Sequence, residues 1–354
     1  MSEFKLGELF CGPGGIAQGA TTSQVTNPNY RIVHQWATDY DYDTCSTYQN
    51  NICSQERDSV VCGDIRKLDI ENDLGIKGDI DALAFGFPCN DYSVVGEHKG
   101  LEGSFGPLYS YGVKALRIFK PRWFLAENVG GLQTANDGKA FTQILNDMKD
   151  AGYTVTPHLY KFDQYGVPQA RHRIIIVGIH KSESVTYRVP STLPYVDVDN
   201  SCRAAIEKPP IAVDAPNNER TKQSETVIRR LQHIRPGENA FTADLPDDLQ
   251  IKTATKISQI YKRLDPKKPA YTVTGSGGGG THIYHWEEPR ALTNRERARL
   301  QTFPDTYIFH GSKESVRRQI GMAVPCDGAK VIFEAILNTF AGITYEHVKP
   351  NIKQ

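Results

Sequence analysis

One short segment, residues 86–90 (GFPCN), places a cysteine directly after a predicted strand. Ligands of open α/β sheets bind beyond the carboxyl ends of the strands, so the Cys89 thiol would face such a site. The usual alternative for a free cysteine is burial in the core. Residues 91–106 repeat glycine among polar residues, a composition typical of a loop that closes over an active site. The position favours Cys89 as a nucleophile.

Three further charged side chains flank predicted strands. Glu127 follows the next strand and would point into the same crevice, where burial would favour its protonated form and let it donate a proton. Taken alone, Glu127 is better explained as a helix cap or a surface acid. Arg171 and Arg173 alternate before another strand, so they share one face and suit a phosphate or a carbonyl oxygen. Solvated charges are the usual alternative for such a pair.

A glycine turn, residues 10–15 (FCGPGG), follows the first predicted strand. Glycines there let the backbone approach a ligand, and the following helix N-terminus favours an anionic group. Asp39 ends the second strand, where an acid bonds ribose hydroxyls, and Tyr40 offers a ring for stacking. Asp64 suits an adenine amino group, although a helix cap explains it equally well. The turn lacks the GxGxxG spacing, and a purely structural turn remains the commoner explanation.

These residues need a scaffold that brings strand ends together. Short apolar runs alternate with helical patterns up to about residue 182, which predicts a parallel α/β sheet covered on both faces. Prolines and polar turns then indicate a second, irregular domain, and residues 324–340 have a helical pattern. The strands are expected at 4–10, 31–38, 60–62, 80–85, 122–126, 153–160 and 173–179, and the helices from 16 and at 108–119 and 141–149.

Composition narrows the class of protein. The chain has 354 residues and a formal net charge of zero, which argues against non-specific binding of polyanions but permits a local basic groove. No apolar run approaches the ~18 residues of a membrane span, so we expect a cytoplasmic protein without membrane contact. Seven scattered cysteines contain no CxxC pair, which predicts reduced thiols and no metal site.

Six segments in order resemble motifs of the cytosine-5 DNA methyltransferases of the prokaryotic restriction–modification type. They are Leu9–Gly19 (LFCGPGGIAQG), Pro88–Cys89, Glu127–Val129 (ENV), Gln169–Arg173 (QARHR), Arg290–Pro304 (RALTNRERARLQTFP) and Arg317–Pro325 (RRQIGMAVP). The resemblance implies a Rossmann-like, S-adenosylmethionine-dependent α/β fold with a mostly parallel sheet and a smaller, irregular target-recognition domain. It divides the chain into a catalytic domain (1–182), a recognition domain (183–290), a connector (291–317) and a C-terminal segment returning to the catalytic domain (318–354).

The resemblance also implies residue roles. Cys89 would be the nucleophile, Glu127 would contact N3 and the amino group of cytosine, Arg173 the base carbonyl and a nearby phosphate, and Arg171 would support the active-site loop. Pro88 would line the methyl donor. The implied cofactor site comprises Phe10 against adenine, Gly12, Gly14 and Gly15 on the methionine side, Asp39 at the ribose, Asp64 at the adenine amino group, and Tyr40, Ile65 and Pro88.

The implied reaction converts S-adenosylmethionine to S-adenosylhomocysteine on double-stranded DNA, with a monomeric enzyme and no metal. A cognate restriction endonuclease is a possible partner without stable contact. In the recognition domain, Lys262, Arg263, Lys267 and Lys268 are candidates for phosphate contacts, with a solvated charged loop as the alternative.

The sequence departs from the family at Met322, which stands where the tenth motif has Asn, and at Phe105 and Asn90. A catalytically silent DNA-binding relative and an RNA cytosine-5 methyltransferase are therefore alternative predictions. The Cys-Phe-Thr tripeptide typical of the RNA branch is absent from the variable region. A nicotinamide oxidoreductase would not require Cys89 and Glu127 together.

Overall fold

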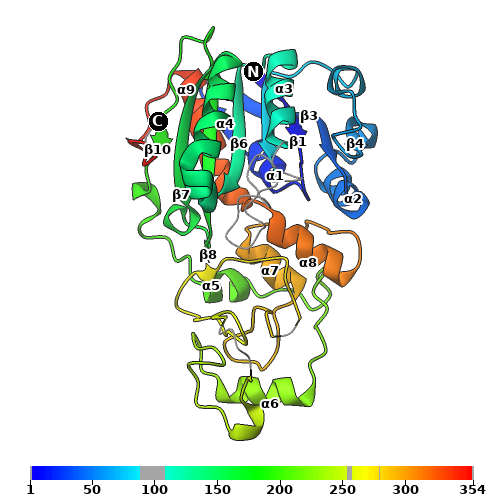
Figure 1. Ribbon diagram of the computed structural model, residues 1–354, viewed down its shortest axis with the longest axis vertical. Coiled ribbons are helices and arrows are strands. Elements are labelled where there is room, and N and C mark those ends of the chain that lie inside the picture. The colour runs from blue at the N-terminus through cyan, green and yellow to red at the C-terminus, as the bar shows by residue number, and fades with distance from the viewer. Residues whose placement is uncertain (1, 88–107, 253–256, 279, 353–354) are drawn as a thin grey trace.

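A large mixed sheet forms the upper part of the molecule (Figure 1). The computed structural model describes residues 2–87, 108–252, 257–278 and 280–352. The strand order is β2-β3-β1-β5-β6-β9-β7, with β4 beside β3. The strands are β1 (Ser2–Leu9), β2 (Gln24–Thr26), β3 (Asn29–Asp39), β4 (Val60–Cys62), β5 (Ala82–Gly86), β6 (Trp123–Val129), β7 (Tyr153–Lys161) and β9 (His172–His180).

The sheet is parallel only in part. β1 pairs in parallel with β3 and β5, and β5 with β6, as the sequence predicts. β9 is antiparallel to both β6 and β7, so the expectation of a parallel sheet is wrong for this edge. The connection from β7 to β9 is too short for a crossover helix, which leaves an antiparallel pair. As a result the start of β9 lies beside the end of β6, with Arg173 opposite Val129.

Helices cover both faces of the sheet. On one face lie α3 (Tyr109–Phe119) and α4 (Lys139–Asp150), and on the other α1 (Gly15–Thr21) and α9 (Cys326–Ala341), as Figure 1 shows. α9 buries Ala329, Ile332, Phe333, Ile336 and Leu337, the spacing of one apolar helix face. α2 (Tyr42–Asn51) follows β3. Among the described residues, no helix is long and apolar enough to cross a bilayer.

The lower part of the molecule is built mainly from irregular chain (Figure 1). Its helices are α5 (Cys202–Glu207), α6 (Glu225–His233), α7 (Asn294–Leu300) and α8 (Lys313–Met322), and α7 and α8 lie next to the sheet-bearing part. One small pairing ties it to the rest: β8 (Gln169–Ala170) runs parallel to β11 (Ala270–Tyr271). A second pairing, β10 (Val189–Pro190) antiparallel to β12 (His347–Val348), lies beside α9 in the upper part.

Buried arginines satisfy the backbone carbonyls that irregular chain leaves unpaired. Arg263 is 5% exposed and donates to the carbonyl oxygens of Leu231, Ile234 and His285 at 2.8–3.0 Å. The expectation that Arg263 meets a DNA phosphate is therefore wrong, because its guanidinium faces the interior of this part of the fold.

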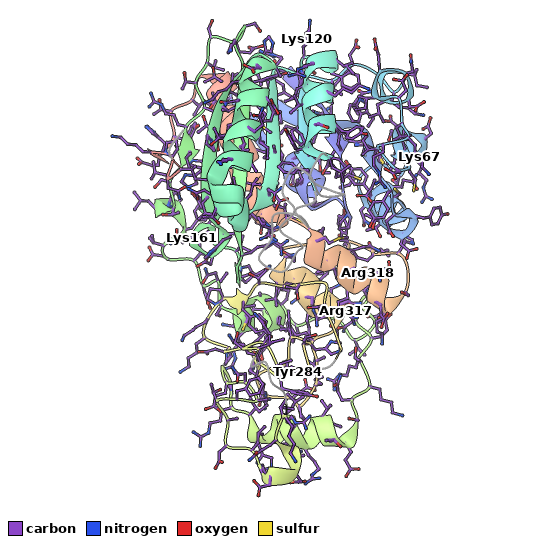
Figure 2. All side chains as sticks on the ribbon, viewed as in Figure 1. Lys67, Lys120, Lys161, Tyr284, Arg317 and Arg318 are labelled. Carbon is purple, nitrogen blue, oxygen red and sulfur yellow. The ribbon has the colours of Figure 1, made fainter. Side chains whose placement is uncertain are left out.

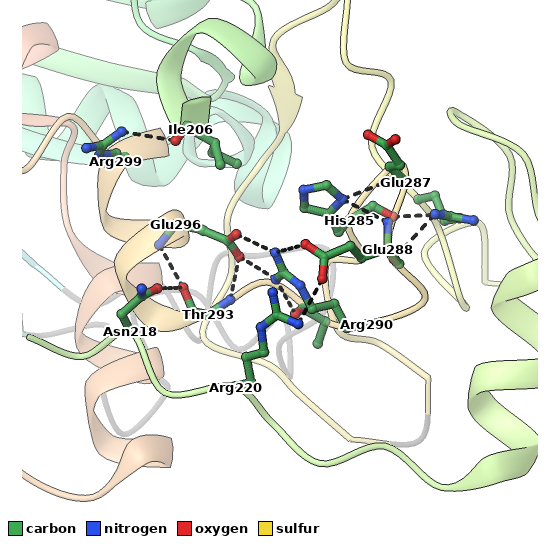
Figure 3. Close-up of polar contacts among 12 residues, drawn as sticks. Ile206, Asn218, Arg220, His285, Glu287, Glu288, Arg290, Thr293, Glu296 and Arg299 are labelled. Atoms are coloured by element: carbon green, nitrogen blue, oxygen red, sulfur yellow. Dashed lines mark hydrogen bonds and ion pairs between the residues drawn. The ribbon is translucent and has the colours of Figure 1, made fainter. Parts of the chain in front are cut away.

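A dense polar network fixes the start of α7 (Figure 3). The Thr293 hydroxyl accepts from the Glu296 backbone N–H at 3.1 Å, and the Glu296 carboxylate accepts from the Thr293 backbone N–H at 2.8 Å, which forms a capping box. Arg290 donates to both oxygens of Glu296, at 2.7 and 2.8 Å. The segment that resembles the ninth motif, residues 290–304, thus caps the N-terminus of α7 and fixes the start of that helix.

Candidate active site

A cavity of about 700 Å³ opens at the carboxyl edge of the sheet, a volume typical of small-molecule sites. Its wall combines the ends of β1, β3, β5 and β6, the start of β9 and the last turns of α8. Most predicted site residues of the described chain line it: Phe10, Gly12, Gly15, Asp39, Tyr40, Asp64, Ile65, Glu127, Arg171 and Arg173. Pro88 and Cys89 lie outside the described residues, as do Asn90 and Phe105.

The glycine turn combines left-handed backbone with a close contact. Gly12 has φ 56°, and a Cβ there would meet nothing within 4 Å, so the turn leaves open space on the cavity side. A Cβ on Gly15 would overlap the carbonyl oxygen of Val324, so α1 needs glycine to approach that wall. Gly14 has φ 93° and does not line the cavity. A Cβ there would lie 2.5 Å from the Tyr307 hydroxyl, which gives this glycine a packing role.

Two carboxylates lie on the side of the cavity where β3 and β4 end. Asp39 accepts the Gly12 backbone N–H at 3.0 Å and that of Asp41 at 3.1 Å, and burial raises the pKa of Asp39. Asp64 is paired with Arg66, whose Nη2 donates to it at 2.6 Å, and this bond lowers the pKa of Asp64 to about 2. Asp64 also accepts the Arg66 backbone N–H at 3.0 Å, so it caps a turn while lining the cavity.

Glu127 and Arg173 form an ion pair on the other side. Arg173 Nε lies 2.8 Å from Glu127 Oε1, and the side chains are 14% and 13% exposed. Gly86 stands opposite Glu127 in the sheet, and its lack of a side chain leaves space beside the carboxylate. The neighbouring Asn128, which also lines the cavity, donates to the Phe87 carbonyl oxygen at 3.1 Å. The pair presents an acceptor and a cation to the cavity.

Arg171 is positioned differently from Arg173. It is 1% exposed and donates to the carbonyl oxygens of Val273, at 3.0 Å, and Met322, at 3.3 Å. Arg171 therefore links the end of α8, which forms one wall of the cavity, to the segment that follows β11 in the lower part of the molecule. The sequence indicated that Arg171 supports the site, but only the fold identifies what it holds.

Several cavity residues have no role in the sequence prediction. They are Arg66, Asn128, Ser315, Arg318 and Gln319. Asn128 carried a signal, since it follows Glu127 in the ENV motif. The three residues of α8 share one helix face, but nothing local indicates that this face turns towards a sheet formed some 300 positions earlier.

The chain matches the model of the C-5 cytosine-specific DNA methylase family over residues 4–338. It belongs to this family. The type II methyltransferase M.BbvI of Brevibacillus brevis is 57% identical over 355 residues, covering 98% of this chain and 94% of that protein. The type II methyltransferase M.NgoFVII of Neisseria gonorrhoeae is 39% identical over 348 residues, covering 97% of this chain and 89% of that protein.

Solved structures share the fold at low identity. A protein described as a DNA modification methyltransferase encoded within an Escherichia coli prophage superimposes with a TM-score of 0.72 at 22% identity, covering 95% of this chain and 99% of that one. The Dnmt2 methyltransferase of Schizosaccharomyces pombe gives a TM-score of 0.57 at 15% identity, covering 95% and 98%. The predicted α/β methyltransferase fold is confirmed, and so is the predicted class of enzyme, a DNA cytosine-5 methyltransferase.

The family's methyl donor, S-adenosylmethionine, suits the chemistry of this cavity. Asp39 and Asp64 can accept from hydroxyl and amino groups. Phe10 and Ile65 offer apolar surface to a ring, and the space beside Gly12 admits an extended ligand.

Proposed function

We propose that the enzyme transfers a methyl group from S-adenosylmethionine to carbon 5 of a flipped cytosine in a specific duplex DNA sequence, with Cys89 as nucleophile and S-adenosylhomocysteine as product. The observation that carries the proposal is one cavity that holds both Asp39 and the Glu127–Arg173 pair. Phe87, which directly precedes Pro88 and Cys89 in the chain, lines that same cavity. A site for the donor and a site for the base are thus adjacent.

The chemistry requires a nucleophile and a proton donor. Carbon 5 of cytosine is too weakly nucleophilic to accept a methyl group directly. The Cys89 thiolate adds to carbon 6 while Glu127 supplies a proton at N3, which makes carbon 5 enamine-like. Carbon 5 then accepts the methyl group and loses its proton to a base, the thiolate leaves carbon 6, and N3 returns its proton to Glu127. When bound, S-adenosylmethionine supplies the methyl group on a sulfonium.

Glu127 and Arg173 each recognise a different part of the target base. The Glu127 carboxylate, freed in part from Arg173, contacts N3 and the exocyclic amino group. Arg173 contacts the base carbonyl and a nearby phosphate, for which a guanidinium is well suited. Arg171 does not contact the base. Its hydrogen bonds to the Val273 and Met322 carbonyl oxygens stabilise the cavity wall against which the active-site loop closes.

Cofactor binding is assigned to the opposite side of the cavity. Phe10, Tyr40 and Ile65 contact the adenine, Asp39 the ribose and Asp64 the adenine amino group. Gly12 and Gly15 shape the methionine side together with Pro88, while Gly14 acts through its packing on Tyr307.

DNA is assigned to the space between the two parts of the molecule. The target base leaves the duplex at a cost of a few kcal/mol in unstacking and unpairing. Lys262, Lys267 and Lys268 contact phosphates, with the glycine run that begins at Gly275 nearby in the chain. We assign residues 1–182 to the catalytic domain and residues 183–290 to the recognition domain. Residues 291–317 connect the two, and residues 318–354 return to the catalytic domain. The relatives' names favour a type II modification enzyme. We assign it to the prokaryotic cytoplasm, as a monomer beside a separate cognate endonuclease.

Labelled S-adenosylmethionine, presented with duplex DNA and in parallel with RNA, tests this proposal on wild-type and Cys89→Ala protein. We expect label in DNA as 5-methylcytosine only with wild-type protein, and sequencing of the product gives the target site. Transfer to RNA alone would move the enzyme to the RNA branch. Tight DNA binding without transfer to either substrate would identify a catalytically silent relative.

A further inference from the structure

Four arginines line the cavity, and three of them are already engaged. Arg66 pairs with Asp64, Arg173 with Glu127, and Arg171 donates to backbone carbonyls. The fourth, Arg318, is exposed, and within the described ranges its guanidinium has no ion pair or hydrogen bond. Among the described residues, this part of the cavity therefore carries a cation that no acidic side chain neutralises.

The packing of α8 leaves Arg318 at the cavity. A Cβ on Gly275 would lie 2.9 Å from the Arg318 Cα, so the backbone at Gly275 packs closely on this turn of the helix, and Arg318 lines the cavity. Figure 2 shows Arg317 and Arg318 on α8, where the helix lies between the sheet and the lower part of the molecule. Only Arg318 of the two lines the cavity.

The remaining polar groups of this helix face are used within the protein. Gln319 donates to the His310 carbonyl oxygen at 2.7 Å and accepts from the Thr47 hydroxyl at 2.7 Å. Ser315 accepts from Gln319 at 3.3 Å. Met322, one turn after Arg318 and 57% exposed, offers a thioether in place of an amide. Arg318 is thus the one ionic donor that this wall presents among the described residues.

We infer that Arg318 binds the carboxylate of the methyl donor's amino-acid end and replaces the polar contact that Met322 has removed. The inference rests on the proposed cofactor assignment. An amino-acid carboxylate is the anionic group of that ligand, and its other end is assigned to Asp39 and Asp64. A guanidinium recognises a carboxylate through two parallel N–H donors. Arg318 is a binding residue here and takes no part in the bond-making steps.

Calorimetric binding without DNA tests the inference with two ligands. S-adenosylhomocysteine carries the carboxylate, whereas 5′-methylthioadenosine keeps the adenosine and the thioether but lacks the amino acid. We expect Arg318→Gln to weaken S-adenosylhomocysteine binding by roughly 5- to 30-fold, less than for a buried charged bond because solvent screens an exposed group. Binding of 5′-methylthioadenosine should stay within about twofold, an amount below the worth of one hydrogen bond.

Three variants serve as matched comparisons. Arg317→Gln makes the same change one residue away on α8, outside the cavity lining, although Arg317 also donates to the Gly275 and Gly277 carbonyl oxygens at 3.4 and 3.5 Å. Both affinities of this variant should stay within about twofold of wild type. Arg318→Lys should keep most of the affinity for S-adenosylhomocysteine. Met322→Asn added to Arg318→Gln should recover part of it, because an amide then stands one turn away on the same face.

Two results would overturn the inference while the proposed function stands: unchanged S-adenosylhomocysteine binding by Arg318→Gln, or an equal loss for both ligands. The first, accompanied by weaker and less salt-dependent DNA binding, would assign Arg318 to a DNA phosphate. If wild-type protein bound neither ligand, the cofactor assignment itself would fail, and the inference with it.

Discussion

A buried acid beneath the cavity gives the sharpest prediction about stability. Glu8 on β1 is 1% exposed, accepts the Tyr48 hydroxyl at 3.1 Å through Oε2, and has no hydrogen bond to Oε1 within the described chain. Burial raises its pKa from 4.5 to about 8, and Asp39 nearby contributes. Folded protein therefore holds Glu8 protonated at neutral pH, whereas unfolded protein ionises it.

The direction in which stability changes with pH follows from proton binding at Glu8. Between pH 4.5 and 8 the folded state binds more protons at Glu8 than the unfolded state, so the free energy of unfolding falls as the pH rises. Because one pKa unit corresponds to about 1.4 kcal/mol, the loss across this range is roughly 4 to 5 kcal/mol. Glu8→Gln keeps the shape and the acceptor for Tyr48 but does not ionise. Its stability relative to wild type should thus rise by several kcal/mol from pH 5 to pH 8.

Urea unfolding of both proteins at several pH values between 5 and 8 measures this difference, since groups that titrate alike in both proteins cancel. Glu3→Gln, an exposed acid on the same strand, is the control and should show little change with pH. A difference between Glu8→Gln and wild type that is flat with pH, or that shrinks as the pH rises, would refute the reasoning.

Three other outcomes follow from particular contacts. Glu127→Gln should lower kcat by about 10²- to 10⁴-fold while S-adenosylhomocysteine binding is retained, because it removes the proton donor and the ion pair with Arg173 on the base side of the cavity and leaves the cofactor side unchanged; full activity would contradict the assigned role. Gly321→Ala should destabilise by about 1–3 kcal/mol in urea unfolding, since its Cβ would overlap the Gly275 backbone, whereas Gly75→Ala, whose Cβ would lie 3.7 Å from its neighbour, should change little. Arg297 is 1% exposed with Nε and Nη2 unpaired within the described residues, so Arg297→Met should raise the free energy of unfolding by about 1–4 kcal/mol; a loss of stability would argue that the charge is satisfied.

Local sequence determined the strands, the strand-end residues and the family. Apolar runs predicted β5 and β6, because burial on both faces needs continuous hydrophobic residues. Shorter apolar stretches predicted β3 and β4, which are buried only in part. Its position at a strand end predicted that Glu127 would point into the crevice, and the structure places it 2.8 Å from Arg173. The motifs predicted the reaction class through their resemblance to the family, and two of them place Cys89 and Glu127 directly after or at the end of a predicted strand.

Tertiary structure alone decided which charges are available to a ligand. Arg263 and Arg173 look alike in sequence, yet one holds interior carbonyls and the other lines the cavity. Arg171 and Arg318 differ likewise: one joins Val273 to Met322, and the other is unpaired in the described part of the wall. Burial and hydrogen-bonding partners come from segments far away in the chain, whereas a sequence pattern records only the periodicity of neighbours. The sequence did not predict the strand order β6-β9-β7 either, because the partner of a strand depends on where the strands pack and not on their composition.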